Sequence, residues 1–365
     1  MFDGRVPYRD FFMEYPPGAL AVFLPADVFG SSHYNDAFKW LMALCGVATL
    51  FVIALLLVRL GASEARIWSG TLLFALSPIA LGPISLNTYD AWPALLTIVA
   101  LALLLAGSAV AALVVLGLAF AAKVYPVVLL PPALIFVWRT AGGERALRAL
   151  AAFVGTAAIL LLPFLALAPH GLAESFRAQA GRSLQEESLG GSVLAVADRL
   201  GLYGATVVHR AGHAISYDLV GSLPDALAVL SSVAQGVAVL AATWLYFRGP
   251  DEPRRLTAAF AAAIIGFLAF TRFFSPQYMV WVVPFAVLLG PAAWALAALA
   301  LVLAQLWFFH YHHGALGGYF WLVLLRDVVV VVLYAVVLTR LRIGTPVKDE
   351  DPVLLEDQSP LRVPS

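Results

Sequence analysis

The sequence predicts an all-α fold, a polytopic transmembrane helical bundle with about 9–11 membrane spans. Hydrophobic residues make up 62% of the chain, charged residues make up only 12%, and the mean hydropathy is +0.90. An ordinary soluble domain has about a quarter charged residues, so this chain has too little charge to cover a water-facing surface. Several apolar runs also reach the roughly 20 residues that cross a bilayer as a helix.

Nine apolar runs are predicted to span the membrane, and the shorter ones lie near the lower length limit. They cover residues 38–60, 67–86, 91–107, 150–168, 226–247, 256–271, 278–290, 292–309 and 319–340. One more apolar stretch, from Ala109 to Trp138, is interrupted at Lys123 and Pro126. It is too long for one span and short for two, so we interpret it as a re-entrant or tightly paired helical hairpin.

Arginine residues predict which side of the membrane each connector faces. The positive-inside rule places four basic segments in the cytoplasm, and chain parity agrees if the hairpin enters and leaves on the same side. These segments contain Arg59 and Arg66; Arg139, Arg145 and Arg148; Arg248, Arg254 and Arg255; and Arg340, Arg342 and Lys348. Residues 341–365 are polar, acidic and proline-containing, which predicts a disordered cytoplasmic tail.

The other polar segments are then predicted to share the extracytoplasmic face. They are an N-terminal segment, 1–37, a long connection, 169–225, and three short segments, 87–90, 272–277 and 310–313. A transmembrane domain, 38–340, carries all of these except the first. Because separate spans bring polar residues to one face, we expect one assembled site there.

Composition and motifs exclude several classes of function. The formal net charge is +0, which argues against nucleic acid as a partner. The single cysteine, Cys45, excludes an internal disulfide and a cysteine-based metal cage. The sequence also contains no phosphate-binding glycine loop, no HExxH and no GxSxG, and no cofactor is implied.

The N-terminal segment contains the first candidate site residues. Two prolines that follow Tyr15 impose an extended backbone and exclude a helix there. Asp10 and Glu14 precede them closely, together with two arginines. This pattern fits either a polar part of the site or a solvated arm with local ion pairs.

Two further candidates lie beside apolar runs. Asp90 directly precedes an apolar run with Pro93 in its first turn, so it is well placed to cap that helix, a role compatible with a substrate contact. Lys123 interrupts the hairpin, and a lysine at membrane depth costs about 2.5–3.5 kcal/mol on insertion scales. It is therefore expected to snorkel to an interface or to contact an anion.

The long outer connection and the mouth of a later span supply three more candidates. The stretch from Arg182 to Leu189 has the pattern of an amphipathic interfacial helix. Aromatic residues between Arg272 and Tyr278, and Trp281 after them, are typical of an interfacial belt. Arg272 and Gln277 themselves are expected on the polar face, near the other clusters.

The last candidates are histidines and a buried ion pair. His310, His312 and His313 favour an interfacial or anion-contacting role over zinc, because their spacing matches no familiar site and no carboxylate lies nearby. Arg326 and Asp327 lie inside the final apolar run. They form either a mutually compensated pair or a site in which the arginine faces the substrate.

Five motifs combine into a family resemblance. They are Gly4-Arg5-Val6-Pro7-Tyr8-Arg9-Asp10 with Glu14-Tyr15-Pro16-Pro17, Asn87-Thr88-Tyr89-Asp90-Ala91-Trp92-Pro93, Lys123-Val124-Tyr125-Pro126, Arg182-Ser183-Leu184-Gln185-Glu186-Glu187-Ser188 and Ser275-Pro276-Gln277-Tyr278. Together they resemble glycosyltransferase family 87, polytopic enzymes of the GT-C fold. The tyrosine-proline-proline and serine-proline-glutamine elements are the more specific parts of a resemblance that covers most of the chain up to the last span.

The resemblance implies a hexosyltransferase of the bacterial plasma membrane. It implies a polyprenyl-phosphate sugar donor, often a mannose donor, a lipid or glycan acceptor, membrane lipids as surroundings, and transfer on the extracytoplasmic face. A carboxylate base would deprotonate the acceptor, and cationic or hydrogen-bonding groups would hold the phosphate without a metal. The predicted catalytic residues are Asp10 and Glu14, and the predicted substrate-binding residues are Tyr15, Asp90, Lys123, Arg182, Arg272, Gln277, His310 and Arg326.

One departure from the family pattern concerns the base. Family members usually carry a span before the Pro-Tyr element and an aspartate just after that span. Here Met1 lies only a few residues before Pro7. We therefore expect that the true start lies upstream, that the chain is defective, or that a nearby carboxylate substitutes, with Asp10 and Glu14 ahead of Asp3.

Two other classes of function remain open at this stage. Intramembrane Lys123 and Arg326 and the broken hairpin would suit a secondary transporter or lipid flippase. Against it, the sequence shows no internal repeat and its polar clusters lie on one side, whereas a transporter site should lie near the midplane. A noncatalytic scaffold is the third alternative.

Overall fold

The computed structural model describes residues 4–210, 216–311 and 319–343, which form fifteen α-helices and one small sheet. The helices are α1 (Leu20–Asp27), α2 (Tyr34–Arg59), α3 (Glu64–Leu81), α4 (Ile84–Asn87), α5 (Ala91–Leu105), α6 (Ala109–Ala122), α7 (Leu130–Ala141), α8 (Gly143–Leu167), α9 (Pro169–Ala180), α10 (Leu189–Arg199), α11 (Ser222–Phe247), α12 (Pro253–Ala269), α13 (Met279–Leu289), α14 (Pro291–Tyr311) and α15 (Phe320–Ile343). The antiparallel sheet has the order β1-β3-β2, with strands β1 (Leu184–Gln185), β2 (Thr206–Arg210) and β3 (Ser216–Val220). The predicted all-α polytopic fold is confirmed.

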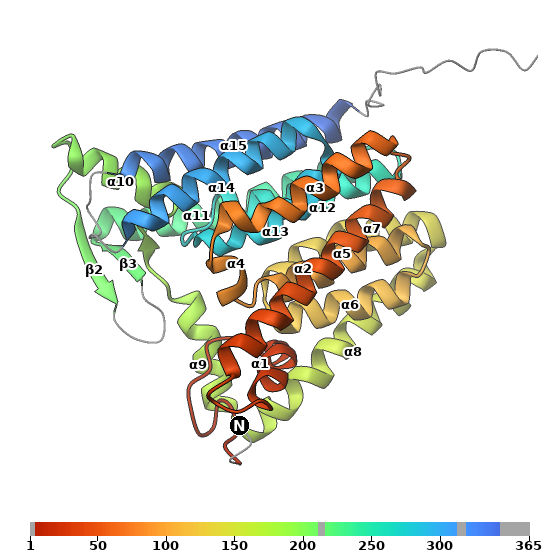
Figure 1. Cartoon of the computed structure of the whole chain (residues 1–365), viewed down its shortest axis with the longest axis horizontal. Helices are drawn as coiled ribbons and strands as arrows, with labels where there is room; N and C mark the ends of the chain where they lie inside the picture. Colours follow the sequence, from red (N-terminus) through yellow and green to blue (C-terminus); the bar gives the residue numbers. More distant parts are fainter. Residues whose placement is uncertain (1–3, 211–215, 312–318, 344–365) are drawn as a thin grey trace, which may run out of the picture.

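The helices form two groups that meet at α13. Helices α2, α5, α6 and α8 pack side by side in chain order, and α11, α12, α15 and α14 form the second group (Figure 1). Helix α13 contacts members of both groups, and α3 packs against it and α14. Helix α13 has only 11 residues and is buried throughout except at Val280, as expected for a helix between two groups.

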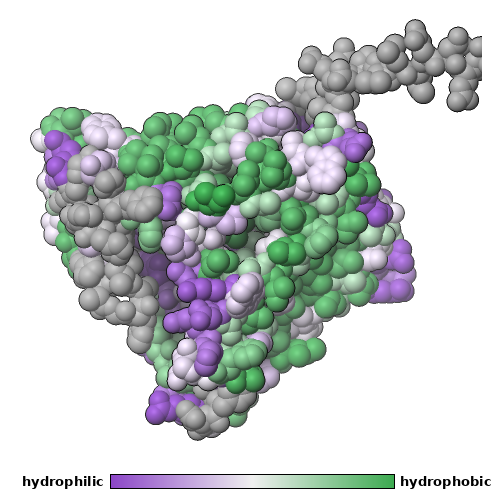
Figure 2. Space-filling model, in the orientation of Figure 1, coloured by the Kyte–Doolittle hydropathy of each residue, from purple (hydrophilic) through white to green (hydrophobic). Residues whose placement is uncertain are grey.

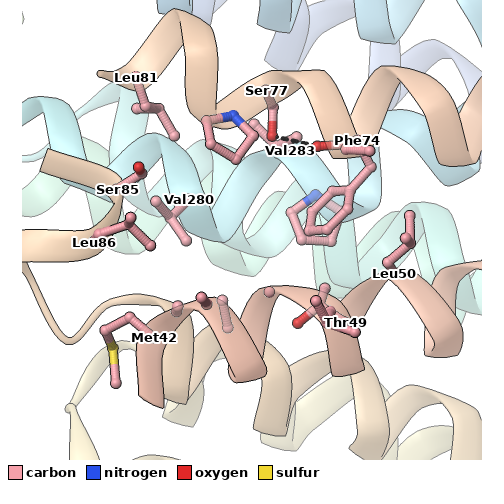
Figure 3. A pocket seen from close by; sticks show the side chains of 18 residues that line it. Met42, Thr49, Leu50, Phe74, Ser77, Leu81, Ser85, Leu86, Val280 and Val283 are labelled. Carbon is pink, nitrogen blue, oxygen red and sulfur yellow. Dashed lines mark hydrogen bonds between the residues drawn. The ribbon is translucent and has the colours of Figure 1, made fainter. Parts of the chain in front are cut away.

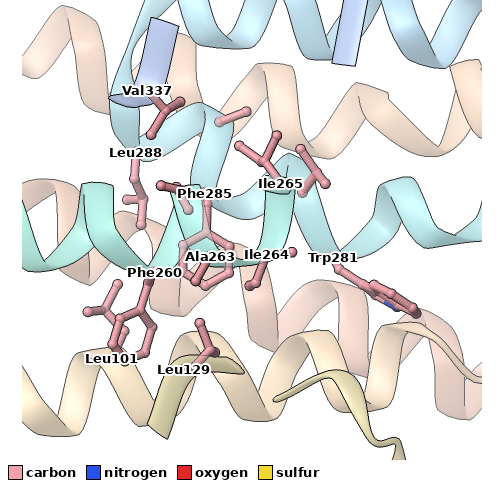
Figure 4. Close-up of a cluster of buried hydrophobic side chains, with 14 of the residues drawn as sticks. Leu101, Leu129, Phe260, Ala263, Ile264, Ile265, Trp281, Phe285, Leu288 and Val337 are labelled. Atoms are coloured by element: carbon pink, nitrogen blue, oxygen red, sulfur yellow. The ribbon is translucent and has the colours of Figure 1, made fainter. Parts of the chain in front are cut away.

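The core lies where α12 and α13 meet the first group. Figure 4 shows Phe260 and Ile264 of α12 near Leu101 of α5, Leu129 and Phe285, and each of these five side chains is fully buried. Alanine occupies five of the six positions 258–263 on α12, all of them buried. Small residues let helices approach closely in a bilayer, where association depends on packing rather than on a hydrophobic driving force.

The outer surface is apolar in the way that a lipid-facing surface requires. Helices α2, α8, α11, α14 and α15 are each long and apolar enough to cross a membrane. Large hydrophobic side chains such as Trp40, Leu55 and Ile159 are mostly exposed. Figure 2 shows hydrophobic residues covering much of the face that α2, α3, α14 and α15 present, with hydrophilic residues gathered near the N-terminal segment and α9. The chain is thus a multi-pass membrane protein.

The predicted hairpin is interrupted where the sequence indicates, but its two arms are not tightly paired. Helix α6 ends at Ala122, Lys123 adopts an extended conformation, and a 3-10 turn, Tyr125–Leu129, leads into α7. Both α6 and α7 pack mainly against α8 rather than against each other. The apolar surface of α8 replaces the expected contact between the arms, because α8 offers 25 residues along which both can lie.

The four arginine-rich connectors lie together at one end of the bundle. Arg139 of α7 donates to the carbonyl oxygen of Gly249 and to Asp251, in the turn between α11 and α12. Arg254 donates to the Leu60 carbonyl oxygen at the end of α2, and Arg66 to that of Leu288 at the end of α13. The predicted grouping on one face agrees with this arrangement.

The prediction of an interfacial helix from Arg182 to Leu189 is wrong. Only β1 and a turn occupy this stretch, and α10 begins at Leu189 with Ser188 accepting a hydrogen bond from the Gly191 amide. The Gln185 amide donates to the Arg272 carbonyl oxygen, and the Glu186 amide donates to that of Tyr217. These long-range backbone bonds satisfy the groups that a helix would otherwise pair.

Candidate active site

A cavity of about 470 Å³ lies at the end of the bundle away from the arginine-rich connectors. This volume is within the range typical of small-molecule sites, roughly 300–1,000 Å³. Segments far apart in the sequence line it: Glu14, Tyr15, Pro16, Tyr89, Lys123, Val124, Tyr125, Ser175, Phe176, Gln179, Ala180, Arg182, Gln185, Phe267, Leu268, Thr271, Phe273, Ser275, Gln277, Tyr278 and Trp281. Glu14 is the one carboxylate in this lining, and Lys123 and Arg182 are its two cations.

Close backbone contacts fix the N-terminal segment at the cavity. A Cβ on Gly18 would lie 2.6 Å from the backbone of Ala121 and Ala122, so only glycine lets the chain pass so near the end of α6. A Cβ on Gly171, in α9, would lie 1.8 Å from the Tyr8 carbonyl oxygen. The Tyr8 hydroxyl in turn donates to the Tyr15 carbonyl oxygen at 2.5 Å. These contacts bring the tyrosine-proline-proline element beside Lys123.

Lys123 and Asp90 form the first ion pair of the site. The Lys123 Nζ lies 2.5 Å from Asp90 Oδ1, and the same oxygen accepts a hydrogen bond of 2.7 Å from Trp281 Nε1. The ammonium also lies 4.8–4.9 Å from the ring centroids of Tyr89, Tyr278 and Trp281. Each of these rings attracts a cation through its π face, so the rings and Asp90 together favour the ammonium form of Lys123 in a largely apolar setting.

Glu14 and Arg182 form the second ion pair, beside α9. Glu14 Oε1 lies 2.5 Å from Arg182 Nη2 and accepts a hydrogen bond of 2.8 Å from Gln179 Nε2. The Glu14 carbonyl oxygen accepts a further bond from the Ser175 hydroxyl. The Arg182 guanidinium lies 5.1 Å from the Phe273 ring centroid. Helix α9 therefore holds Glu14 through both its backbone and its side chain.

Stacked aromatic rings line the cavity around Lys123. Trp281 stacks on Tyr125, with centroids 3.9 Å apart and planes 6° apart, and on Tyr278, with centroids 4.3 Å apart. On the other side, Tyr15 contacts Tyr89 at 4.5 Å between centroids. Rigid rings of this kind can support a sugar ring or a lipid chain while leaving the charged groups to bind a phosphate.

An apolar pocket of about 270 Å³ adjoins this cavity along the chain. Figure 3 shows it between α2, which carries Met42 and Thr49, and α3, which carries Phe74 and Leu81. Its lining includes Ala91 and Val280. Tyr89 and Trp281, which lie close to these residues in the sequence, line the polar cavity. A charged cavity and an apolar pocket are thus lined by residues close together at the starts of α5 and α13.

Sequence comparison gives this arrangement a family. The sequence model of glycosyltransferase family 87 matches residues 12–271, which include every segment that lines the cavity except Phe273 to Trp281. The chain belongs to glycosyltransferase family 87. It is therefore a membrane glycosyltransferase, and the family argues against the transporter alternative. Among curated proteins, none matches the chain.

Half of the ten site residues predicted from the sequence line the cavity of this glycosyltransferase. Glu14, Tyr15, Lys123, Arg182 and Gln277 line it. Asp90 lies directly behind Lys123, but its side chain does not cap α5. The capping interpretation is wrong because both an ammonium and an indole N–H compete for the same carboxylate oxygen.

Besides Asp90, four predicted site residues are absent from the described lining of the cavity. Asp10 is paired with Arg9 near the surface, and the hydrogen bonds from Arg9 and the Val6 amide lower the pKa of Asp10 to about 2. Arg272 donates to the Ala180 carbonyl oxygen, beside the cavity. His310 lies near the end of α14, and its side chain is outside the described parts, as are Asp3, His312, His313 and the tail from residue 344.

Arg326, the fourth, belongs to a separate and fully enclosed cluster. Arg326 Nη2 lies 2.8 Å from Asp327 Oδ1, and the guanidinium also donates to the Glu187 carbonyl oxygen. Ser192 donates to Asp327, and Trp307 donates to Glu187 Oε1 at 2.8 Å. The interpretation as a mutually compensated pair agrees with these contacts.

Two neighbouring glutamates extend this enclosed cluster toward the sheet. Burial raises the pKa of Glu187 to about 7, although Arg326 and the Trp307 hydrogen bond favour its charged form. Burial, with Glu187 and Asp218 nearby, raises the pKa of Glu186 to about 9. Neither carboxylate oxygen of Glu186 has a hydrogen-bond partner among the described residues. Glu186 is therefore protonated at neutral pH.

Sequence reasoning missed two residues that support Glu14. Ser175 and Gln179 lie four residues apart on α9, so both face the same way, and Arg182 follows three residues later. That spacing was the available signal. Trp281 was interpreted only as part of an interfacial belt, because its bond to Asp90 spans 191 positions of the chain.

Proposed function

We propose that this glycosyltransferase transfers a hexose, with mannose as the expected sugar, from a polyprenyl-phosphate donor. The acceptor is a lipid or glycan on the extracytoplasmic face of a bacterial plasma membrane. The observation that carries the proposal is the cavity lined by one carboxylate and two cations, with an apolar pocket lined by nearby residues of α5 and α13. Donor chemistry asks for both parts, because the phosphate is charged and the prenyl chain is apolar.

The charged groups divide into two roles in the proposed reaction. The acceptor oxygen bonds to the anomeric carbon as the bond from that carbon to the phosphate oxygen breaks. Polyprenyl phosphate leaves with the bonding electrons, and Lys123 and Arg182 stabilise its negative charge. Both cations have donors left after their ion pairs, since an ammonium has three N–H groups and a guanidinium has five.

Glu14 is the proposed proton acceptor within the described chain. The acceptor hydroxyl loses its proton as the sugar is transferred, and a carboxylate oxygen takes it up. Glu14 lines the cavity, whereas Asp10 does not.

The face of the membrane follows from charge in this proposal. The arginine-rich end is assigned to the cytoplasm by the positive-inside rule. Helix α13 begins beside the cavity and ends at the arginine-rich end, so the cavity opens toward the opposite side. Polyprenyl-linked sugars would therefore be used outside the cytoplasm.

A transfer assay with purified protein tests the proposal. The full chain in liposomes is given a radiolabelled polyprenyl-phosphate mannose and a membrane lipid extract as acceptor. We expect labelled glycolipid from the wild type and little from Lys123→Met, with Arg9→Met as the matched cation control outside the cavity. Equal transfer by Lys123→Met and the wild type would contradict the assigned phosphate site, and no transfer from any prenyl donor would contradict the function.

A further inference from the structure

A second pocket lies at the arginine-rich end, far from the sugar-transfer cavity. It has a volume of about 60 Å³ and contains four arginines from three helices, Arg66, Arg254, Arg255 and Arg340, with Glu252 as the only carboxylate in its lining. By the same measure a single water needs roughly 10–15 Å³, so the pocket has room for one tetrahedral anion. Four positive charges face one negative charge across this small space.

Each arginine is anchored by a helix-end carbonyl group. Arg254 donates to the carbonyl oxygen of Leu60 at 3.0 Å, Arg255 to that of Leu245 at 2.8 Å, and Arg340 to that of Leu289. Such bonds satisfy carbonyl groups that have no partner within their helix. They use only one or two of the five N–H groups of each guanidinium, so most donors remain for another ligand.

Three of the four arginines have no carboxylate partner among the described residues. Among the ion pairs of the described residues, none includes Arg254, Arg255 or Arg340. Arg255 is nearly fully buried, and its Nε has no hydrogen-bond partner there. Burying like charges together is unfavourable unless a counter-ion lies among them. The pocket is thus built for an anion.

The surroundings indicate what carries the anion. On α2 and α3, next to the pocket, Leu55, Val58 and Trp68 expose large apolar side chains, Trp68 to 70%. A tryptophan beside arginines is typical of the membrane interface. Guanidinium groups bind phosphate oxygens in a bidentate way, and basic pockets between transmembrane helices bind lipid head groups.

We propose that this pocket binds the phosphate group of an anionic phospholipid, with the acyl chains lying against α2 and α3. The bound lipid stabilises the junction of α2, α3, α12, α13 and α15, since residues of all five line the pocket. Binding does not depend on the sugar-transfer reaction.

Thermal unfolding of the purified full chain in a neutral detergent tests the inference. The probes are dioctanoyl phosphatidylglycerol, dioctanoyl phosphatidylcholine and inorganic phosphate. We expect the phosphatidylglycerol to raise the melting temperature saturably and the phosphatidylcholine, with the same chains, to have little effect. A shift by inorganic phosphate alone supports the phosphate site and identifies a free anion as a second source.

Three variants decide whether the arginines carry the effect. Arg254→Gln and Arg340→Gln should each weaken apparent binding about tenfold, equivalent to about 1.4 kcal/mol. Arg248→Gln is the matched control, because Arg248 stacks on Trp244 at the same end and does not line the pocket. If Arg340→Gln does not fold, Arg254→Gln carries the test, since Arg254 is exposed. Equal weakening in all three variants, or no shift by any phosphate compound, would overturn the inference.

Discussion

Two buried charge clusters of this protein have similar chemistry and different access. Arg182 and Glu14 line a cavity and keep side-chain exposures of 22% and 13%, whereas Arg326 and Asp327 are 0% and 1% exposed. In the enclosed cluster, the contacts come from protein groups, Ser192, Trp307 and the Glu187 backbone, and none of the cavities described above is lined by Arg326 or Asp327. The open cluster leaves N–H groups toward a cavity. Exposure to a cavity, rather than the presence of charge, therefore distinguishes a substrate site from a structural ion pair.

The largest effect is expected for the carboxylate of the open cluster. In Glu14→Gln, the amide oxygen can still accept a hydrogen bond from Gln179 or Arg182, but the side chain can no longer take up a proton. Sugar transfer should therefore fall by about 10²–10⁴-fold. The matched change Asp10→Asn lies outside the cavity and should leave the rate near that of the wild type. Initial rates of labelled-sugar transfer measure both. Mild effects in both variants would mean that neither Glu14 nor Asp10 is the base.

The next effect separates the two arginines by stability. Arg326→Met leaves Asp327 buried without its cation, which should lower the free energy of unfolding by about 3–5 kcal/mol. Arg182→Met removes a partly exposed pair and should cost about 1 kcal/mol or less. Thermal unfolding in detergent compares them, and transfer assays should show the reverse order of damage for the folded fraction. Equal loss of stability would remove the distinction between the clusters.

A pH effect is expected from the acid beside the enclosed cluster. The folded-state pKa of Glu186 is about 9, above its ordinary value of 4.5, so the folded protein binds a proton that the unfolded chain releases. Stability from this group is fully present below pH 4.5 and falls as the pH rises toward 9, by at most about 1.4 kcal/mol per pH unit. Glu186→Gln should flatten this decline in unfolding measurements between pH 5 and pH 9, where those limits are roughly the two pKa values. An unchanged slope would show that Glu186 is not buried in its neutral form.

The smallest effect is expected from a residue that only supports Glu14. Gln179→Leu removes one hydrogen bond to the carboxylate, which is worth about 1 kcal/mol, or about fivefold in kcat/KM. Gln179→Glu should be worse, since it places a second negative charge beside Glu14. Steady-state kinetics of transfer measure both changes. A larger loss in the leucine variant than in Glu14→Gln would assign Gln179 a direct role in the reaction.

The sequence predicts the helices well because lipid imposes a simple rule on them. Runs of apolar residues that avoid charge locate α2, α8, α11, α14 and α15 within a few residues of their ends. Arginine distribution also predicts which connectors group together. The stretch from Arg182 to Leu189 was mistaken for a helix because its amphipathic pattern is local, whereas the bonds that form β1 come from residue 217 onward and from Arg272.

The sequence predicts several residues of the site, but it does not predict which of them form ion pairs with each other. Lys123 stands out because a lysine within an apolar run needs a compensating partner. Its partner Asp90 lies 33 positions earlier and was interpreted as a helix cap, since local sequence offers no sign of the contact. Arg326 stands out for the same reason as Lys123, yet it is enclosed. Sequence marks an expensive charge, and only the fold shows whether a cavity reaches it.

The central claim, that the open cavity holds the donor on the extracytoplasmic face, can be tested by cysteine labelling. Val124 lines the cavity and is 40% exposed, and Cys45, the one native cysteine, is replaced by alanine. In intact cells, a membrane-impermeant maleimide should label Val124→Cys, and polyprenyl-phosphate mannose added to right-side-out vesicles should block labelling.

Leu202→Cys provides the matched control for this measurement, because Leu202 is exposed on the same predicted side and does not line the cavity. It should be labelled from outside with or without the donor. We expect the donor to block maleimide labelling at position 124 and not at position 202. Labelling of Val124→Cys only from the cytoplasmic side, or outside labelling that the donor leaves unchanged, would contradict it.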